Sequence, residues 1–334
     1  MTKGTKIFRI IVCTLLSLTM LFSAFFAFVF CLAISKEAYG IYVAGVSRTR
    51  SNKDDVLGDG TVYYDDNNNI LIFDNATIES EDAIIYSSID LNIQLAGENK
   101  FICTNEGYGM GIYAGDYHLA KDLSITGDGS LTIEFPSKGS EAVGIYASNL
   151  SVLSDVTVIT SDCENQVNGI VCASSLILAN KATVTVSGGK STKYSSAVRV
   201  RGNALFEEGT KLNASVNPGT SGICKGLTIN GDLYLGKDTA LNVSIDDGAT
   251  VLGECIRISG LMEIGIGSSV IASAKNAYAI ECFGTIEANE GASISAASDK
   301  KDADVFCNGA VVNYGAEVTG EIYAMVGIRY CDSN

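Results

Sequence analysis

The sequence contains no tryptophan, one histidine and two prolines among its 334 residues. The lack of tryptophan removes the residue that most often stacks on sugar rings, which weakens any argument for carbohydrate binding. With His118 as the only histidine, a histidine zinc site is unsupported, and a Ser-His-Asp triad would depend on this one residue, which no nucleophile-elbow motif accompanies. The scarcity of proline argues against disordered, proline-rich linkers.

Positive charge is also scarce, because 23 Lys and Arg face 38 Asp and Glu and give a formal net charge of −15. Phosphate binding needs a basic face, so this balance disfavours nucleic acid as a partner. It is typical of a soluble surface rod. No run has the helical spacing that the crossover helix of an α/β unit requires, so we expect an all-β chain.

What the sequence does contain is a repeat, clearest between Ala277 and Val318. Two segments, 279–284 and 291–296, return in the same order as 304–309 and 315–319. Extended backwards, this template gives two columns of apolar residues that keep step at intervals of 24 to 33 residues. The first column contains Ile112, Ile145, Ile170, Val198, Ile223, Ile256, Ile280 and Val305. The second column contains Leu131, Val156, Val184, Leu212, Leu241, Val270, Ile294 and Val318.

Each repeat contains short segments with alternating apolar residues, such as 176–178 and 183–186, separated by Gly, Asn, Asp or Ser. A unit of this size cannot bury its apolar face alone and must stack on its neighbours. We therefore predict a parallel β-helix solenoid with one coil per repeat and about eleven coils spaced about 4.8 Å apart. A β-propeller is the alternative, but its blades of about 40 to 50 residues exceed this period.

Residues 1–40 form an N-terminal hydrophobic segment in which Lys3, Lys6 and Arg9 precede an uncharged run that ends at Ile34. This pattern predicts a hydrophobic helix that directs export, with the N-terminus inside the cell. The run is long enough to remain as a transmembrane anchor through residues 7–34. The small residues around Ala38 equally permit cleavage as a signal peptide, so both readings stay open. The remainder is expected at the extracellular face of the cell membrane or secreted.

Residues 41–80 differ from the repeat. Residues 61–64 and 70–73 flank the polar segment 65–69, which predicts a β-hairpin with a five-residue tip. A solenoid must cover the open strand edge of its first coil. We therefore assign residues 41–80 to an N-terminal cap with the first strands, and residues 81–334 to the repeat domain.

Five segments resemble a known family: Val43–Val46, Asn52–Asp65, Ile70–Ile78, Leu123–Ile133 and Gly144–Ala147. The family consists of exported bacterial proteins, common in Gram-positive gut anaerobes, that are described as carbohydrate-binding-domain-containing proteins. The likeness covers about residues 40–325. It implies a right-handed parallel β-helix, binding of plant cell-wall polysaccharides including cellulose and acidic pectin-type chains, and calcium in the fold.

Cysteine is plentiful, but no CxxC pair is present among the ten cysteines. Cys172, Cys282 and Cys307 share the position two residues after the first column, where other coils have alanine, valine or isoleucine. This predicts buried core residues. A disulfide between Cys282 and Cys307 is the alternative, because the two should lie in adjacent coils.

Carboxylates are densest near the predicted hairpin, where Asp59, Asp65 and Asp66 lie. Such side chains could bind calcium, which takes several oxygen ligands. Turn chemistry is the favoured alternative, because Asp side chains bond their own backbone in turns and no spaced motif such as an EF-hand loop is present. Calcium therefore stays a candidate cofactor.

One residue after each first-column position comes a further series, which should face outward because side chains alternate along a strand. This series contains Tyr113, Tyr146, Val171, Arg199, Cys224, Arg257, Glu281 and Phe306. Tyr113 and Tyr146 could stack on sugar rings, and Arg199 and Arg257 could bind carboxylates bidentately. Strand propensity alone could also place Tyr and Arg there. We take these four residues as candidate ligand-binding residues.

Together these patterns predict a non-catalytic module that binds an extended extracellular polysaccharide, and acidic polysaccharides are among the candidate ligands. A surface adhesin or structural protein that binds a protein partner is the first alternative. A β-helix polysaccharide lyase or hydrolase is the second, although the sequence assigns no catalytic residue.

Overall fold

The computed structural model describes residues 39–116, 119–136, 138–217, 219, 222–246, 252–275, 278–299, 304–313 and 315–331. The predicted membrane segment 7–34 and the single histidine, His118, lie outside the described residues. Within the described ranges, no helix has the length and apolar character needed to cross a membrane.

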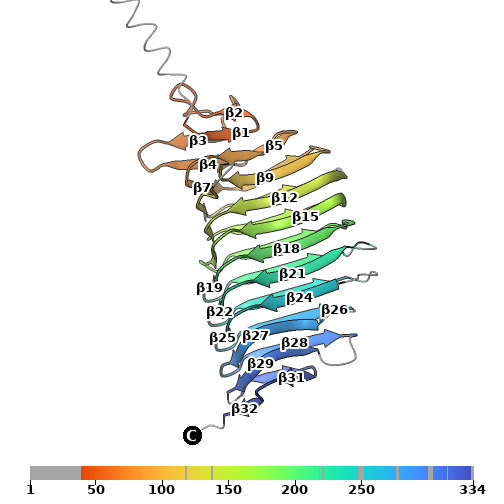
Figure 1. The fold of residues 1–334 in the computed structure, drawn as a ribbon. Helices are drawn as coiled ribbons and strands as arrows, with labels where there is room; N and C mark the ends of the chain where they lie inside the picture. The colour runs from red at the N-terminus through yellow and green to blue at the C-terminus, as the bar shows by residue number, and fades with distance from the viewer. Residues whose placement is uncertain are drawn as a thin grey trace, which may run out of the picture.

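Each coil of the rod contains three strands that pair with the equivalent strands of the next coil, which confirms the predicted all-β parallel solenoid (Figure 1). The first strands are β4 (Ile70–Asp74), β7 (Leu91–Ala96), β10 (Leu123–Gly127), β13 (Leu150–Val152), β16 (Leu176–Leu178), β19 (Ala204–Phe206), β22 (Leu233–Leu235) and β25 (Met262–Ile264). The second strands form a separate 10-stranded sheet: β5 (Thr77–Ser80), β8 (Glu98–Cys103), β11 (Ser130–Glu134), β14 (Asp155–Ile159), β17 (Thr183–Gly188), β20 (Lys211–Val216), β23 (Ala240–Ile245), β26 (Ser269–Ala274), β28 (Ser293–Ser298) and β30 (Glu317–Thr319).

The third strands are β6 (Ile85–Ser87), β9 (Tyr108–Ala114), β12 (Gly139–Ala147), β15 (Cys163–Cys172), β18 (Tyr194–Val200), β21 (Ile223–Ile229), β24 (Leu252–Ile258), β27 (Tyr278–Ala288), β29 (Val305–Val312) and β31 (Ile322–Ala324). The long strands β27 and β29 continue into the first-strand position of the following coil, where β32 (Ile328–Tyr330) pairs with the end of β29. First and third strands belong to one 22-stranded sheet.

The structure has about eight regular coils, fewer than the eleven that the sequence predicts. These coils run from β7 to the start of β29. The residues before Leu91 and after Cys307 lie outside these regular coils, so dividing the length of residues 41–334 by the repeat overcounts the coils.

The strand register confirms the predicted second column in full, since each member pairs with the next from Leu131 to Val318. In the first column, the assignment of Ile223 is wrong. Val198 pairs with Leu227, which in turn pairs with Ile256. Ile223 instead begins β21 on the outer surface, 39% exposed. Both residues are apolar and four positions apart, so the repeat period alone could not distinguish them.

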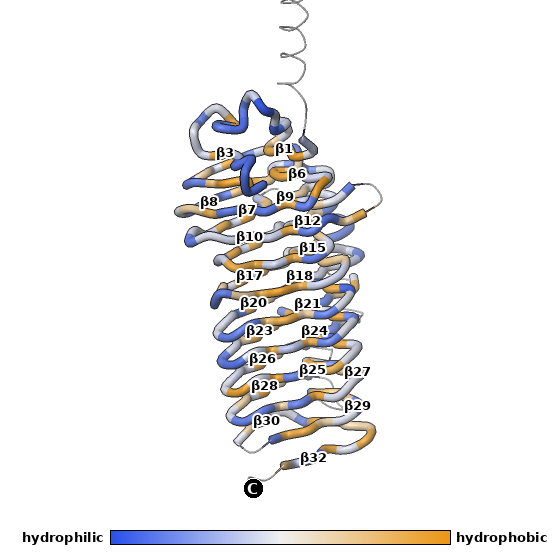
Figure 2. The backbone as a smooth tube through the Cα atoms, turned by 90° about the vertical axis from the view of Figure 1, so that its left-hand side faces the viewer, coloured by the Kyte–Doolittle hydropathy of each residue, from blue (hydrophilic) through white to orange (hydrophobic). Residues whose placement is uncertain are grey.

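The core lies inside the coils because apolar residues alternate with polar ones along the strands. In β17, Val184 and Val186 point inward and are fully buried, while Thr183 and Thr185 face outward and are partly exposed. Figure 2 shows this alternation as orange and blue segments that follow one another along the coils. Burial of each such aliphatic side chain contributes about 1.5–3 kcal/mol, so stacking supplies the stability that no single coil has.

The three repeat cysteines are core residues, as predicted. Cys172, Cys282 and Cys307 are 0% exposed. Cys282 and Cys307 are register partners in adjacent coils, yet both are free thiols. They therefore fill the interior as small apolar side chains, like Ala114 and Ala147 at the same template position.

A column of small residues bends the third strands from β9 to β27. It contains Gly111, Gly144, Gly169, Ala197, Gly226, Cys255 and Ala279, each directly before an inward first-column residue. A Cβ atom on Gly144 would lie 2.3 Å from a methyl group of Val158 and 2.5 Å from the carbonyl oxygen of Gly169. Two successive residues thus point inward, and the outer surface of the strand carries a line of side chains on each side of the bend.

The predicted hairpin at the N-terminal end is present, since β3 (Val62–Asp65) pairs antiparallel with β4, but its tip is shorter than predicted and spans residues 66–69, because Asp65 pairs with Ile70. Nearby, β1 (Ile41–Val43) pairs antiparallel with β2 (Val46–Ser47) and with β6. The guanidinium of Arg48 lies between two rings, 4.1 Å from the Tyr39 centroid and 3.9 Å from the Tyr64 centroid. Its charge is paired with Asp66.

Candidate functional site

An unbroken outward ladder runs along the third strands from one end of the rod to the other. It contains Tyr42, Tyr86, Tyr113, Tyr146, Val171, Arg199, Thr228, Arg257, Glu281, Phe306 and Tyr323. The four candidate residues of the sequence analysis all belong to it. The prediction of Cys224 in this series is wrong: Cys224 is 1% exposed in the core, and Thr228 takes the position because the register follows Leu227. We call the surface of these strands the ladder face.

The tyrosines at the N-terminal end of the ladder stack on one another. Tyr113 lies between Tyr86, with ring centroids 6.0 Å apart, and Tyr146, with centroids 4.8 Å apart. The ring planes differ by only 3° and 12°. Both faces of the Tyr113 ring are therefore covered, and only its edge and hydroxyl group can meet a ligand.

The two candidate arginines have different surroundings. Arg257 donates to Glu254 at 2.7 Å and lies 3.9 Å from a carboxylate oxygen of Glu281. Glu254 also pairs with Lys225 at 2.7 Å. Arg199 lies two coils away in the ladder, and its Nε atom is buried without a hydrogen-bond partner.

A second outward line lies on the other side of the bend. It contains Met110, Val143, Asn168, Ser196, Lys225, Glu254 and Tyr278. Several members of the two lines are buried although they face outward. Val143, Val171 and Thr228 are at most 8% exposed, and neither valine belongs to the main core cluster.

Apart from Glu254 Oε2, which forms an ion pair with Lys225, four side chains beside the bend carry buried polar atoms without a hydrogen-bond partner: Asn168 Oδ1, Ser196 Oγ, Arg199 Nε and Thr228 Oγ1. We call them the polar seam. Asn168 pairs with Ser196 in the next coil, and Arg199 pairs with Thr228. Native proteins leave few such atoms unpaired, because each costs about 1–3 kcal/mol. The seam is therefore a part of the ladder face whose buried polar atoms have no protein partner.

The sequence analysis missed three members of the seam, namely Asn168, Ser196 and Thr228. One signal was available in the sequence. Two residues before the first column, Asn168 and Ser196 are polar, whereas the two preceding coils have Met110 and Val143 at this position. A single sequence does not reveal that outward positions beside the bend are buried, because their burial depends on the small-residue column.

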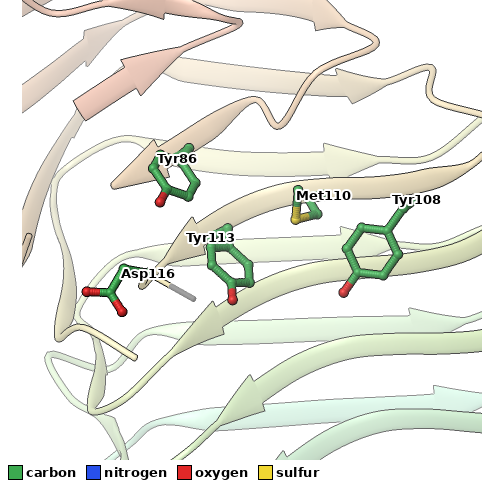
Figure 3. Close-up of a pocket in the computed structure, with 5 residues that line it drawn as sticks. All are labelled: Tyr86, Tyr108, Met110, Tyr113 and Asp116. Atoms are coloured by element: carbon green, nitrogen blue, oxygen red, sulfur yellow. The ribbon is translucent and has the colours of Figure 1, made fainter. Parts of the chain in front are cut away.

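A pocket of about 240 Å³ lies at the N-terminal end of the ladder face. Tyr86, Tyr108, Met110, Tyr113 and Asp116 line it (Figure 3). Burial raises the pKa of the Tyr108 hydroxyl, and the charge of Glu141 raises it further. Burial likewise raises the pKa of Tyr113, with added effects from neighbouring tyrosines and Asp116. The hydroxyls of Tyr108 and Tyr113 thus stay protonated to higher pH than a free tyrosine, and the one charged group among the described lining residues is the Asp116 carboxylate.

The opposite end of the ladder face carries a second aromatic group. Phe306 stacks on Tyr323 with centroids 5.8 Å apart, and it contacts Tyr278 and Phe283 at 5.7 and 6.3 Å. The ladder face is therefore aromatic at both ends and polar or charged in the middle.

The three candidate calcium ligands serve in turns and ion pairs. Asp59 accepts hydrogen bonds from Thr61 N and Oγ1, at 2.9 and 2.7 Å. Asp65 accepts from the backbone of Asn67 at 2.9 Å and from the Asn68 side chain at 2.7 Å. These hydrogen bonds lower the pKa of Asp59 and Asp65.

Asp66 is paired with Arg48 and with Lys53, the latter at 2.8 Å. Among the residues that the structure describes, no three histidine, cysteine or acidic side chains come together as a metal-binding group. The geometry of the hairpin thus follows the turn-chemistry alternative.

The core thiols have little nucleophilic character. Burial raises the pKa of Cys224 and Cys255 to about 12 and that of Cys282 and Cys307 to about 11. The thiolate is the reactive form, so these groups are inert at neutral pH.

Comparisons with known family profiles, with curated proteins and with solved structures find no match for this chain.

Proposed function

We propose that the protein is a non-catalytic binding module that holds an extended polysaccharide along the ladder face. The observation that carries this proposal is the polar seam, where four buried polar atoms in three adjacent coils have no hydrogen-bond partner in the protein. A ligand that displaces the side chains covering these atoms and bonds to them regains the free energy that their burial costs.

The chemistry of the seam favours a ligand with both donors and acceptors. Arg199 Nε can only donate, Asn168 Oδ1 can only accept, and the hydroxyls of Ser196 and Thr228 can do either. Sugar hydroxyl groups and a carboxylate supply such a set. The repeat along the ladder is about 4.8 Å, which is comparable to one sugar unit of an extended chain, so successive units could meet successive coils.

Charge on the ladder face supports an acidic polysaccharide. Arg199, Lys225 and Arg257 lie in consecutive coils, whereas the whole chain carries a net charge of −15. Glu254 and Glu281 offset part of this positive charge. Attraction between an acidic ligand and these side chains should weaken with added salt, because exposed charges are screened within about 10 Å at 0.1 M ionic strength.

The proposal extends to the ends of the chain and to its location. We place residues 1–40 as an export signal or membrane anchor, with the rod outside the cell. In this proposal the β3–β4 hairpin and residues 41–80 cap the first coil, and the coil is right-handed as the family resemblance implies. The resemblance to exported carbohydrate-binding proteins supports this part.

A glycan array with the full-length protein tests the function, using neutral and acidic polysaccharides at two salt concentrations. Retention of acidic chains that declines with salt supports the proposal. Release of unsaturated or reducing sugars would favour the lyase or hydrolase alternative. Absence of binding to every glycan would favour an adhesin with a protein partner.

A further inference from the structure

The pocket at the N-terminal end of the ladder face differs chemically from the polar seam. The described residues that line it are three tyrosines, one methionine and one aspartate, and none of these described residues is a lysine or arginine. The seam contains Arg199, and two further cations lie in the coils beyond it. An acidic chain held along the seam therefore gains nothing from extending into this pocket, and the pocket suits a ligand of the opposite charge.

The rings of the pocket are arranged in two groups. Tyr86 and Tyr113 stack with centroids 6.0 Å apart, so they present their edges and hydroxyl oxygens. Tyr108 lies across from them, beyond Met110, and is 45% exposed (Figure 3). Tyr108 belongs to no ring pair among the described residues, and it is the most exposed of the three tyrosines.

The electrostatics of the pocket favour a cation. The face of an aromatic ring attracts positive charge, and phenol oxygens add partial negative charge. The Asp116 carboxylate lines the pocket, and Glu141 is the register partner of Tyr108 in the next coil. The thioether of Met110 provides a polarisable, uncharged contact at the centre of the pocket.

The same chain already holds a cation in this way elsewhere. The Arg48 guanidinium lies within 4.1 Å of the Tyr39 and Tyr64 ring centroids and pairs with Asp66. Two tyrosines and one aspartate thus suffice to enclose a buried positive charge. The open pocket repeats this combination of tyrosine rings and a carboxylate, with one more tyrosine among its described lining residues.

We propose that this pocket binds a quaternary ammonium group, as found in choline and its phosphate ester. A volume of about 240 Å³ admits a trimethylammonium group with its short alkyl arm. The methyl groups pack on Tyr108 and Met110, and the charge faces Asp116 and the hydroxyl oxygens of Tyr86 and Tyr113. A primary ammonium would lose strong hydration that the few acceptors here cannot replace, so the methylated cation is preferred.

The test is a titration of the full-length protein, purified without choline-containing lipids or detergents, with choline and with 3,3-dimethylbutan-1-ol. The alcohol has the same shape without the charge. We expect choline to bind at least tenfold more tightly, as read from tyrosine fluorescence and from NMR line broadening of the trimethyl signal. Equal affinity for the two probes, or no binding of choline, overturns the proposal.

Two pocket variants locate the site, and a third variant, outside the pocket, serves as the control. Tyr108→Leu should weaken choline binding about tenfold, and Asp116→Asn about fivefold. Tyr330→Leu, at a 68% exposed position at the other end of the rod, should leave it unchanged. Because Asp116→Asn retains an oxygen for the Leu119 amide, its circular dichroism melting curve should match that of the wild type. Unaltered choline affinity in both pocket variants contradicts the assignment.

Two further arms separate the sources of the trimethylammonium group. Free phosphocholine competing with choline, without binding to phosphatidylcholine vesicles, identifies a soluble or polymer-linked ligand. Co-sedimentation with these vesicles, lost in Tyr108→Leu and absent with phosphatidylglycerol vesicles, identifies a lipid headgroup. This inference does not depend on the proposed polysaccharide function, because Tyr108→Leu should leave glycan retention by the seam intact.

Discussion

The ladder face and the outer face of the second strands belong to the same coils, yet they differ in whether their side-chain polar atoms have hydrogen-bond partners. On the second strands, Thr185, Asn213 and Asn242 pair from coil to coil. Asn242 donates to Asn213 Oδ1 at 2.8 Å, and Asn213 donates to Thr185 at 3.5 Å. The polar atoms on this face satisfy one another, while those of the polar seam do not.

This difference follows from the bend in the third strands. Straight strands keep equivalent side chains in line and within hydrogen-bond reach of the next coil. At the bend, two consecutive residues point inward. The outward side chains on either side of them are therefore buried, and their neighbours in the next coil are side chains of a different type. The satisfied face stabilises the rod, whereas the unsatisfied seam is where we propose that recognition takes place.

The largest expected effect comes from filling the bend. In Gly144→Ala the new Cβ would lie 2.3 Å from Val158 and 2.5 Å from the backbone of Gly169, so we expect a loss of about 3 kcal/mol in the free energy of unfolding. Gly188→Ala, on the second strands, is the matched control, because its Cβ comes no closer than 3.3 Å to Val216. Denaturant unfolding measures both. Equal losses would show that the bend has no special packing requirement.

Alkaline pH should loosen the ladder face before the second strands. Burial raises the pKa of Cys282 and Cys307 from 9.0 to about 11. The protonated thiols therefore contribute fully to the free energy of unfolding below pH 9, and this contribution is lost between pH 9 and 11. At pH 10 the free energy of unfolding should be lower than at neutral pH by about 1 kcal/mol for each of these two cysteines.

The distribution of cysteines accounts for this order, because Cys172, Cys224, Cys255, Cys282 and Cys307 all lie on third strands, whereas Cys103 is the one cysteine on a second strand among the described residues. Hydrogen exchange at pH 7 and pH 10 measures the effect strand by strand. Replacing Cys282 and Cys307 together by alanine, which other coils use at this position, should reduce it. Uniform loosening of both sheets would contradict the prediction.

The polar seam should show that function there opposes stability. Asn168→Leu and Thr228→Val remove unpartnered buried atoms, so each should preserve stability or raise it by about 1 kcal/mol. Retention of acidic polysaccharide should decrease at least tenfold. Asn242→Leu is the control on the other face: it should lower stability by about 0.5–1 kcal/mol, because Asn213 loses its donor, and leave retention unchanged.

Thermal unfolding together with glycan retention decides this prediction. A seam variant that loses both stability and binding would indicate a structural role for the polar groups. A seam variant that keeps full binding would remove the basis of the proposed site.

Sequence reasoning recovered the solenoid because its signal is repeated in every coil. The second column, from Leu131 to Val318, was predicted without error, since its strands are short and straight. The first column failed at Ile223, where an apolar residue at the start of β21 imitates the core position. The site was recovered less well. Arg199 was found by its outward position, whereas Asn168 and Ser196 depend on burial that arises only when coils bend and stack.

The smallest expected effect separates the two arginines of the ladder. Arg257 is about one-third exposed and is paired with Glu254 and Glu281, so Arg257→Ala should cost less than about 1 kcal/mol of stability and change polysaccharide retention less than threefold. Arg199→Ala removes the seam's only obligate donor and should reduce retention at least tenfold. Retention measured in both variants at low salt tests the contrast. If Arg257→Ala proves the more damaging, the ligand lies along the charged coils rather than the polar seam, because a guanidinium engaged by two carboxylates could matter more only by exchanging them for the ligand.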